Sequence, residues 1–573
     1  MSELRDLAKE NRKFLAKDLK ITSWESISPY YQQLKEDNIF DFDSFRNWLV
    51  KRSELIAAVE EEKAWRYINT SRYTDNAKYS EAYIIFSQEI EPKITKAENE
   101  LDKKLIGNIA TIELPNDYQV FIRGIKKQLE LYREENIPLL SEIDIEEQKY
   151  SAISGKMSVP FKGQELTLQQ ADNLLKSTDR KIRKIIFDLI TERRGVDYDE
   201  LNRLLDTLVR KRQEVSENAG YEEYVQYKFD QLGRFDYKIE DCTQFQISVK
   251  NSVMPLVNKL TEERCKALNI EKLLPYDLKV DTQGNAPLKP AKTSRELIDK
   301  SIACLNEVDP EFGNCLKQLD DNGYLDLESR KCKAPGGYNY PLFESNVPFI
   351  FMNASNSLRD VVTLMHESGH AVHSILSGKL PIIYQKEFPA EIAELASMSM
   401  ELMTMEHWHH FFQNEEELKR AKREHIEDLI KVLPWVATID KFQHWIYKHH
   451  ENHSSYDRMN AWEKIASEYE SKHMDWYGYE QHHRNSWQKQ IHLFQFPLYY
   501  IEYGIAQLGA IGIWKSYKEN PLKTITNYKN ALSLGYTKTL PELYKTAGVP
   551  FDFSEKHIKK LMEFVKEELS KLD

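Results

Sequence analysis

The chain is poor in residues that break helices and poor in cysteine. Of its 573 residues, 20 are glycine, 20 are proline and 5 are cysteine. The cysteines are scattered and form no C-x-x-C pair, so neither a disulfide framework nor a cysteine-based zinc site is indicated, and we expect reduced thiols. With few breakers and many Glu, Lys and Leu residues, the composition predicts a mainly α-helical protein.

The sequence also has no long apolar run. No stretch approaches the roughly 20 consecutive apolar residues that cross a bilayer, and the first residues are polar where a signal peptide has an apolar core. The formal net charge of −12 argues against nucleic acid as the main partner. We therefore expect a cytoplasmic protein with neither a membrane nor a nucleic-acid partner.

One short stretch carries a pattern with a chemical meaning: His366-Glu367-Ser368-Gly369-His370. On a helix, residues i and i+4 lie on one face, so His366 and His370 can bind the same metal ion. Glu367 points to the side, where it can reach a metal-bound water without being a ligand. The pattern predicts a catalytic zinc site with Glu367 as its base.

The neighbouring residues predict a helix from Leu358 to Ser377. Asn356 or Ser357 can cap its start, and Gly378 stands where a left-handed residue would end it. Gly369 inside this helix costs roughly 1 kcal/mol relative to alanine. We therefore expect another backbone or a ligand to approach closely at that position.

A third metal ligand must come from outside this helix. The metzincin pattern would place a histidine at position 376, but Leu376 stands there. The following predicted helix offers two candidate carboxylates, Glu391 and Glu394, and Glu387 just before it is a third. We favour Glu394, because its small neighbours would let two helices approach closely. Glu401, seven residues on, is predicted to hydrogen-bond the far nitrogen of a metal-bound histidine.

The run from Pro348 through Glu401 resembles the thimet oligopeptidase and oligoendopeptidase F family of zinc metallopeptidases, and is closer to the oligoendopeptidase F branch. An S-x-D-R-x-x-R stretch at 177–183 carries the same likeness, which spans roughly 155–549. The resemblance implies one Zn²⁺ ion, held by His366, His370 and Glu394, with Glu367 as base. It also implies a mainly α, elongated, two-lobed body with a deep substrate channel and a small β-sheet beside a gluzincin-type zinc site.

The chain order suggests two domains. Residues 1–200 are predicted to form an N-terminal helical lobe with a short hairpin near 155–168, and residues 201–573 a catalytic peptidase domain. The N-terminal helices are expected at 43–68, 79–105 and 117–134. The hairpin would turn at Lys162-Gly163.

Two further strands are predicted, at 275–278 and at 347–353, the second directly before the zinc helix. A strand there could hold an extended peptide through main-chain hydrogen bonds, although a small structural sheet explains it equally well. The candidate substrate-binding residues in this region are Gly336, Gly337, Tyr338 and Phe351. The two glycines are also what a turn requires.

A stretch near the C-terminus offers hydrogen-bond donors for an oxyanion. In the resembled family, a histidine and two tyrosines in this region stabilise the tetrahedral intermediate. Carried over, His492, Tyr500 and Tyr503 match best, and Tyr499 stays an alternative that we also consider for substrate binding. Phe496 and Pro497 depart from the glycine-rich segment of the thimet oligopeptidase branch, which leaves the choice among the tyrosines open.

Seven other histidines follow Glu401, and their spacing predicts no further metal site: His407, His409, His410, His444, His449, His450 and His453. The function predicted for the chain is that of a zinc-dependent endopeptidase that cuts internal bonds of short peptides as a monomer or homodimer. The alternatives are a zinc dipeptidase or aminopeptidase, and a non-catalytic helical peptide-binding protein. Cobalt or manganese in place of zinc also stays open.

Overall fold

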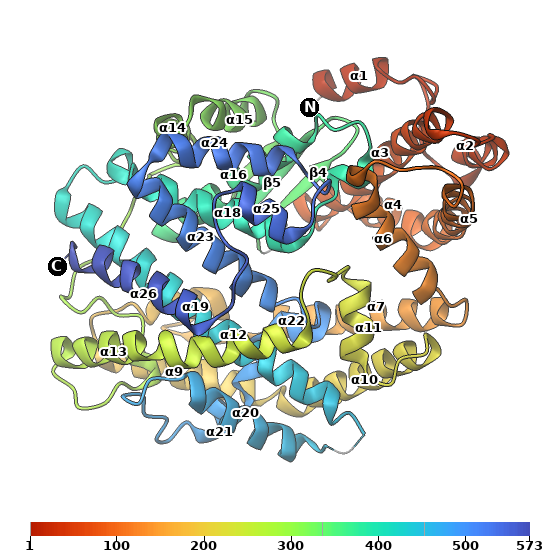
Figure 1. The fold of residues 1–573 in the computed structure, drawn as a ribbon. Coiled ribbons are helices and arrows are strands. Elements are labelled where there is room, and N and C mark those ends of the chain that lie inside the picture. Colours follow the sequence, from red (N-terminus) through yellow and green to blue (C-terminus); the bar gives the residue numbers. More distant parts are fainter. Residues whose placement is uncertain (1, 335, 452, 573) are drawn as a thin grey trace. The chain divides into compact units, whose positions relative to one another are not determined.

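The computed structural model describes residues 2–334, 336–451 and 453–572, and helices dominate it (Figure 1). The predicted mainly α fold with a small sheet is confirmed. Within the described residues, no helix combines the length and the apolar character needed to span a membrane. The elongated shape and the substrate channel stay predictions.

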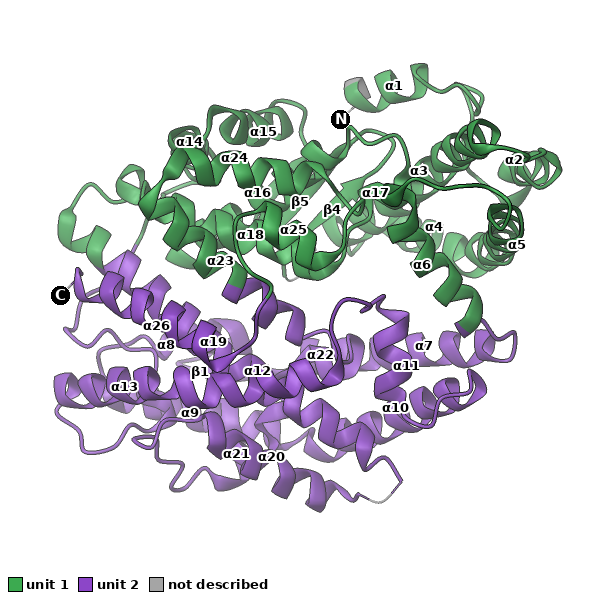
Figure 2. Cartoon of the chain, in the orientation of Figure 1, with its two compact units in different colours: residues 1–130, 289–419, 509–551 green, residues 131–288, 420–508, 552–573 purple. Residues whose placement is uncertain are grey.

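The chain divides into two compact units, each built from three separate segments (Figure 2). Unit 1 comprises residues 1–130, 289–419 and 509–551, and unit 2 comprises residues 131–288, 420–508 and 552–573. The units are thus discontinuous in sequence, whereas the predicted domains meet at residue 200. That predicted boundary stays a prediction.

Unit 1 holds the N-terminal helices and those around the H-E-x-x-H motif. Its helices are α1 (Ser2–Glu10), α2 (Trp24–Glu36), α3 (Phe42–Arg72), α4 (Ala77–Ile85), the π-helix η1 (Phe86–Ile90), α5 (Glu91–Ile109), α14 (Ser294–Val308), α15 (Pro310–Asp321), α16 (Leu358–Ser377), α17 (Ile383–Lys386), α18 (Ala390–Met405), the 3₁₀-helix η3 (Trp408–His410), α24 (Pro521–Ser533) and α25 (Leu540–Thr546).

Unit 2 is also mainly helical. Its helices are α7 (Asn136–Gly155), α8 (Leu168–Leu174), α9 (Arg180–Gly195), α10 (Tyr198–Asn218), α11 (Tyr224–Gln231), α12 (Ile239–Ser252), α13 (Met254–Leu268), η2 (Pro275–Asp277), α20 (Ser455–Tyr469), α21 (Glu480–Asn485), η4 (Ser486–Lys489), α22 (Ile491–Gln495) and α26 (Glu555–Ser570). Three helices have residues in both units: α6 (Asn116–Leu131), α19 (Glu415–Lys448) and α23 (Ile501–Glu519).

A three-stranded sheet lies in unit 1 beside the motif helix. Its strands are β3 (Leu325–Glu328), β4 (Tyr338–Leu342) and β5 (Val347–Ala354), in the order β3-β5-β4. Central β5 pairs parallel with β3 and antiparallel with β4. Most of β5 is buried, because the sheet packs against α16. The predicted strand at 347–353 is therefore confirmed.

The predicted hairpin is also present, in unit 2, as β1 (Ser158–Phe161) and β2 (Gln164–Thr167). Lys162 and Gly163 form its turn with φ of 50° and 78°, as a tight turn between two antiparallel strands requires. Its apolar residues Val159 and Phe161 pack with α9 in a small separate core.

Two local predictions are wrong. Residues 275–278 do not form a strand; Pro275 starts the 3₁₀-helix η2, and the carboxylate of Asp277 binds Arg180 and Arg183 at 2.7 Å each. Gly378 does end α16, but with φ of −57°, because its N–H still donates to the Ser374 carbonyl in a right-handed turn.

The expected helix at 79–105 is interrupted. It is one helical run whose middle is the π-helix η1, with α4 before it and α5, opened by a proline in its first turn, after it. Helices at 43–68 and 117–134 correspond to α3 and α6, with bounds that differ by up to four residues. Ends are where local sequence specifies a helix least.

Candidate metal centre

Helix α16 runs over the predicted bounds, Leu358 to Ser377. Ser357 begins it: its N–H donates to the Asp360 carboxylate at 2.7 Å, so the two residues form a capping box. Leu364, Met365 and Val372 are fully buried. The motif therefore lies on a rigid helix held by the core of unit 1.

Helices α16 and α18 cross very closely at Gly369. A Cβ atom on Gly369 would lie 2.5 Å from the Cα of Ser397 and 2.7 Å from the carbonyl oxygen of Ala396. Real Cβ atoms do not approach that closely, so only glycine fits here. The close backbone predicted from the sequence is that of α18, and the crossing brings Glu394 to the histidines.

The crossing gathers two imidazoles and one carboxylate. The Nε2 atoms of His366 and His370 lie 3.3 and 3.9 Å from Oε2 of Glu394. The two imidazole rings are 4.9 Å apart and nearly perpendicular. One ligand atom from each of the three residues lies within 4.8 Å of the others.

Glu401, two turns after Glu394 on the same face of α18, accepts a hydrogen bond from the His366 ring. Its Oε1 lies 2.6 Å from Nδ1 of His366. A proton on Nδ1 leaves the lone pair of Nε2 pointing toward Glu394 and His370. Ser397 donates to Oε2 of Glu394 at 3.2 Å and so orients that carboxylate.

This donor set fits a catalytic zinc ion. Two histidines and one carboxylate, with a further carboxylate on the outer nitrogen of one histidine, are ligands that zinc takes while keeping a position open. In the described part of the chain, Glu387 and Glu391 do not belong to the group of close ligand atoms, whereas Glu394 does. The ligand assignment itself stays a prediction.

Glu367 is buried beside this set, and its Oε2 has no hydrogen-bond partner among the described residues. Burial raises the pKa of its carboxyl to about 7, and the nearby carboxylates add to the rise while His366 opposes it. Burial also lowers the pKa of His370 to about 4, which keeps its imidazole neutral and able to bind a metal.

The pKa of His366 moves the other way. Burial lowers it, but hydrogen bonds to Glu394 and Glu401 outweigh burial and raise the pKa well above its usual value. The two carboxylates thus stabilise a positive charge at this ring. A divalent cation bound at Nε2 would supply that charge instead of a proton.

Strand β4 reaches the motif helix directly, which the sequence did not indicate. The side-chain amide of Asn339 donates to the main-chain carbonyl of Glu367 at 3.2 Å. Gly337 passes close to β5, since a Cβ atom there would lie 3.2 Å from the carbonyl oxygen of Phe351. Gly336 has φ of 98°, a conformation that favours glycine.

Of the predicted substrate-binding residues, Phe351 is fully buried. Tyr338 stacks on it with ring centres 4.7 Å apart, and the Lys333 ammonium lies 4.4 Å from the ring. Phe351 therefore supports the position of Tyr338, which is half-buried. A direct contact of Phe351 with substrate would require Tyr338 to move.

His492 and the three predicted tyrosines form an aromatic cluster of their own in unit 2. The ring of His492 lies 4.8 Å from that of Tyr500 and 5.8 Å from that of Tyr503, and Tyr499 lies 5.3 Å from Tyr503. Helix α23 begins at Ile501, so Tyr499 and Tyr500 precede it and Tyr503 lies in its first turn. Trp435 donates to the Tyr500 hydroxyl at 3.0 Å.

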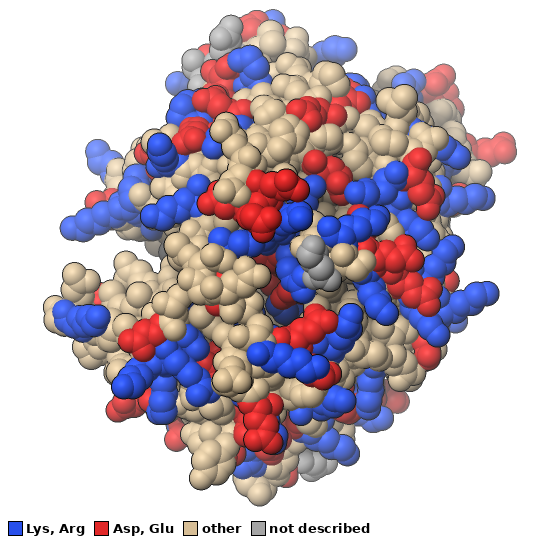
Figure 3. Space-filling view, turned by 90° about the vertical axis from the view of Figure 1, so that its left-hand side faces the viewer, with Lys and Arg blue, Asp and Glu red and all other residues tan. Residues whose placement is uncertain are grey.

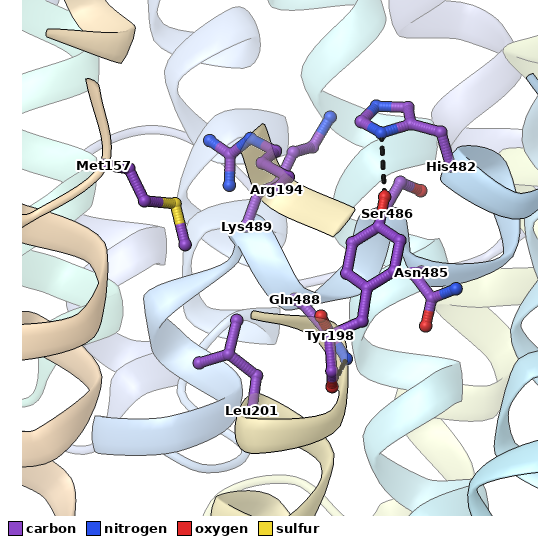
Figure 4. Close-up of a pocket in the computed structure, with 9 residues that line it drawn as sticks. All are labelled: Met157, Arg194, Tyr198, Leu201, His482, Asn485, Ser486, Gln488 and Lys489. Carbon is purple, nitrogen blue, oxygen red and sulfur yellow. Dashed lines mark hydrogen bonds between the residues drawn. The ribbon is translucent and has the colours of Figure 1, made fainter. Parts of the chain in front are cut away.

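Unit 2 also contains a small pocket that none of the predicted site residues lines (Figure 4). The Tyr198 hydroxyl and Nδ1 of His482 lie 3.1 Å apart at its wall. Burial lowers the pKa of His482 to about 3 and that of Lys489 to about 8.

On the face shown in Figure 3, acidic and basic side chains are interspersed, so the acidic excess of the sequence does not gather there.

Comparison with known families and structures covers nearly the whole chain. The family model "Peptidase family M3" matches residues 173–563, and "Peptidase M3 N-terminal domain" matches residues 14–132. Oligopeptidase PepF of Bacillus subtilis is 26% identical over 41% of this chain and 34% of that protein. An oligoendopeptidase F homologue of Borreliella burgdorferi is 22% identical over 89% of this chain and 88% of its own.

A solved structure titled "PZ PEPTIDASE A with inhibitor 2" has the same fold. It superposes with a TM-score of 0.88 over 99% of both chains, at 24% sequence identity. A structure described as a putative oligoendopeptidase F gives the same TM-score at 23% identity.

Proposed function

Because this chain belongs to peptidase family M3, we propose that it is a zinc-dependent endopeptidase that hydrolyses internal bonds of short peptides. The observation that carries the proposal is the group formed by His366, His370 and Glu394, whose ligand atoms lie within 4.8 Å of one another. The names of the relatives, oligopeptidase and oligoendopeptidase F, support peptide hydrolysis as the reaction.

Each residue of the site has its own proposed role. His366, His370 and Glu394 would hold one zinc ion, and Glu401 would orient His366. When bound, the ion polarises a carbonyl group and makes water more acidic. Glu367 takes the proton of the water that attacks the scissile carbonyl carbon and returns it to the nitrogen as the C–N bond breaks.

Strand β4 is our candidate for holding the substrate. Among the strands that the structure describes, β4 has a neighbour on one side only. An extended peptide pairing with its outer edge would be held through its main chain, independently of its side chains. A peptide with one N-methylated amide in the paired register should then show a higher KM, whereas a methyl group one residue further, where the amide points away, should not.

The decisive experiment uses an internally quenched peptide blocked at both ends. Wild-type protein should cut it internally, and Glu367→Gln should bind the same amount of zinc but cut about 10²–10⁴-fold more slowly. Glu415→Gln, an exposed glutamate on α19, is the matched control and should behave as wild type. An aminopeptidase would leave the blocked peptide intact, and a binding protein would bind it without cutting.

The oxyanion role of the aromatic cluster stays a prediction with its own test. Replacing Tyr499, Tyr500 and Tyr503 one at a time by phenylalanine removes one hydroxyl each. Loss of an oxyanion donor costs about 10²–10³-fold in kcat with little change in KM. The tyrosine that shows this split is the donor, and three unaffected variants would remove the cluster from the mechanism. The cytoplasmic location and the monomeric or dimeric state also stay predictions.

A further inference from the structure

A second histidine–carboxylate cluster lies in unit 1, where α18 ends. Glu307 of α14 lies against three histidines that follow Met405: its Oε1 is 2.7 Å from Nε2 of His410 and 3.2 Å from Nε2 of His409. Its Oε2 is 2.9 Å from Nδ1 of His407. The sequence alone predicts no site here, because Glu307 comes 102 positions before His409.

The turn that carries the histidines is well anchored. Trp408, between them, is fully buried and starts the 3₁₀-helix η3. The thiol of Cys304, one turn before Glu307 on α14, donates to the main-chain carbonyl of His407 at 3.0 Å. The side chains of His409 and His410 stay 50% and 28% exposed, so an ion from solvent can reach their Nε2 atoms.

The charge of Glu307 is not matched by a permanent cation. In the part of the chain that the structure describes, its ion partners are these three histidines. One carboxylate and two converging Nε2 atoms form the same kind of donor set as His366, His370 and Glu394.

His407 makes different hydrogen bonds from the other two histidines. Its Nε2 lies 2.9 Å from the Tyr517 hydroxyl, while its Nδ1 holds the Oε2 atom of Glu307. This chain of hydrogen bonds fixes the carboxylate so that Oε1 faces His409 and His410. Partners of this kind orient ligands in metal sites.

We propose that Glu307, His409 and His410 form a second metal site, for a divalent zinc-like transition-metal ion, with His407 as a positioning residue. Ligand atoms of the three lie within 4.8 Å of one another. Because the cluster is exposed, water would complete the coordination, and the ion would tie α14 to the turn that follows α18. The site is separate from the peptidase chemistry and stands whether or not that proposal holds.

The test removes the first site and counts ions at the second. In tag-free protein, His366→Ala/His370→Ala should still bind one equivalent of Zn²⁺ in a titration. Adding His409→Ala/His410→Ala to this background should abolish that equivalent. The matched control is His449→Ala/His450→Ala, an adjacent histidine pair in the turn just after α19, which should leave the bound equivalent unchanged.

Two results would overturn the proposal: no bound equivalent in the His366→Ala/His370→Ala background, or equal loss in both histidine-pair variants. If that background unfolds, wild-type protein gives the same answer, because it should bind one equivalent more than His409→Ala/His410→Ala. Circular dichroism shows which proteins are folded.

The positioning role of His407 has a spectroscopic test. Co²⁺ bound at the second site should show the same absorption band in His407→Gln as in the parent, because the ligands are unchanged. The affinity of the second site for Co²⁺ should fall about 10-fold in His407→Gln. It should fall further in His407→Ala, because glutamine keeps a hydrogen-bond donor and alanine does not. A changed band in His407→Gln would instead make His407 a ligand.

Discussion

Two buried carboxylates of unit 1 are neutralised in different ways. Asp326 on β3 binds three permanent cations, Arg330 at 2.6 Å, Arg72 at 2.7 Å and Lys333 at 2.8 Å. Glu394 on α18 is equally buried, but its charged or chargeable partners among the described residues are the imidazoles of His366 and His370.

The difference separates a structural site from a functional one. The pKa of Asp326 is far below its usual value, because the three cations outweigh the rise that burial alone would cause. A carboxylate paired in this way needs no further cation to balance its charge. Glu394 has two imidazole partners, of which His370 is kept neutral by burial, and a neighbour, Glu367, with an oxygen left without a partner. A buried site of that kind is completed by a cation.

The largest effect is expected at the structural site. Asp326→Asn leaves three cations without their counter-charge and should lower the free energy of unfolding by about 3–5 kcal/mol. Zinc content and cleavage per folded molecule should stay as in wild type. Urea unfolding measures the first, and the peptide assay the second; a variant that is fully stable but inactive would reverse the roles of the two sites.

The same site predicts the response to acid. The folded pKa of Asp326 lies below the value of about 3.9 in an unfolded chain. Its stabilisation is therefore present above that value and is lost as pH falls toward the folded pKa. Between pH 5 and 3, wild type should lose stability more steeply than Asp326→Asn.

At the functional site, Glu394→Gln should reduce zinc affinity by about 100-fold or more. Four-ligand zinc sites bind with about 10–16 kcal/mol, which is roughly 3 kcal/mol per ligand. Glu387→Gln and Glu391→Gln are the comparison; if either loses zinc while Glu394→Gln keeps it, the ligand is that residue.

A smaller effect is expected where the two site helices cross. Gly369→Ala must push α18 away and should cost about 1–3 kcal/mol of stability, together with zinc affinity. Gly124→Ala is the control, because a Cβ atom on this helical glycine of α6 meets nothing within 4 Å. It should instead stabilise the protein by about 0.5–1 kcal/mol. Equal effects on stability at Gly369 and Gly124 would mean that the close crossing of α16 and α18 does not set the effect of Gly369→Ala.

The smallest effect is expected at Glu401. Glu401→Gln keeps the shape of the side chain but weakens the bond to Nδ1 of His366, and zinc affinity should fall about 10-fold. Competition with a chelating dye measures this directly. A loss as large as that of Glu394→Gln would mean that Glu401 is itself a ligand.

The sequence predicts a structural feature well when the residues that determine it lie close together in the chain. The bounds of α16 and the Lys162-Gly163 hairpin follow from caps, periodicity and turn residues within a few positions. Residues 275–278 were mispredicted as a strand because the partners that hold Asp277, namely Arg180 and Arg183, lie almost a hundred positions earlier. Local propensity carries no information on such pairs.

By itself, the sequence determined that His366 and His370 share a face with Glu367 beside them, because helix periodicity is local. It also indicated, through Gly369, that another chain segment passes close by. Only the tertiary structure decided which cations surround Asp326, that Asn339 contacts the motif helix, and that Glu307 meets His409 and His410. These are contacts between distant segments, and the packing of the core sets them.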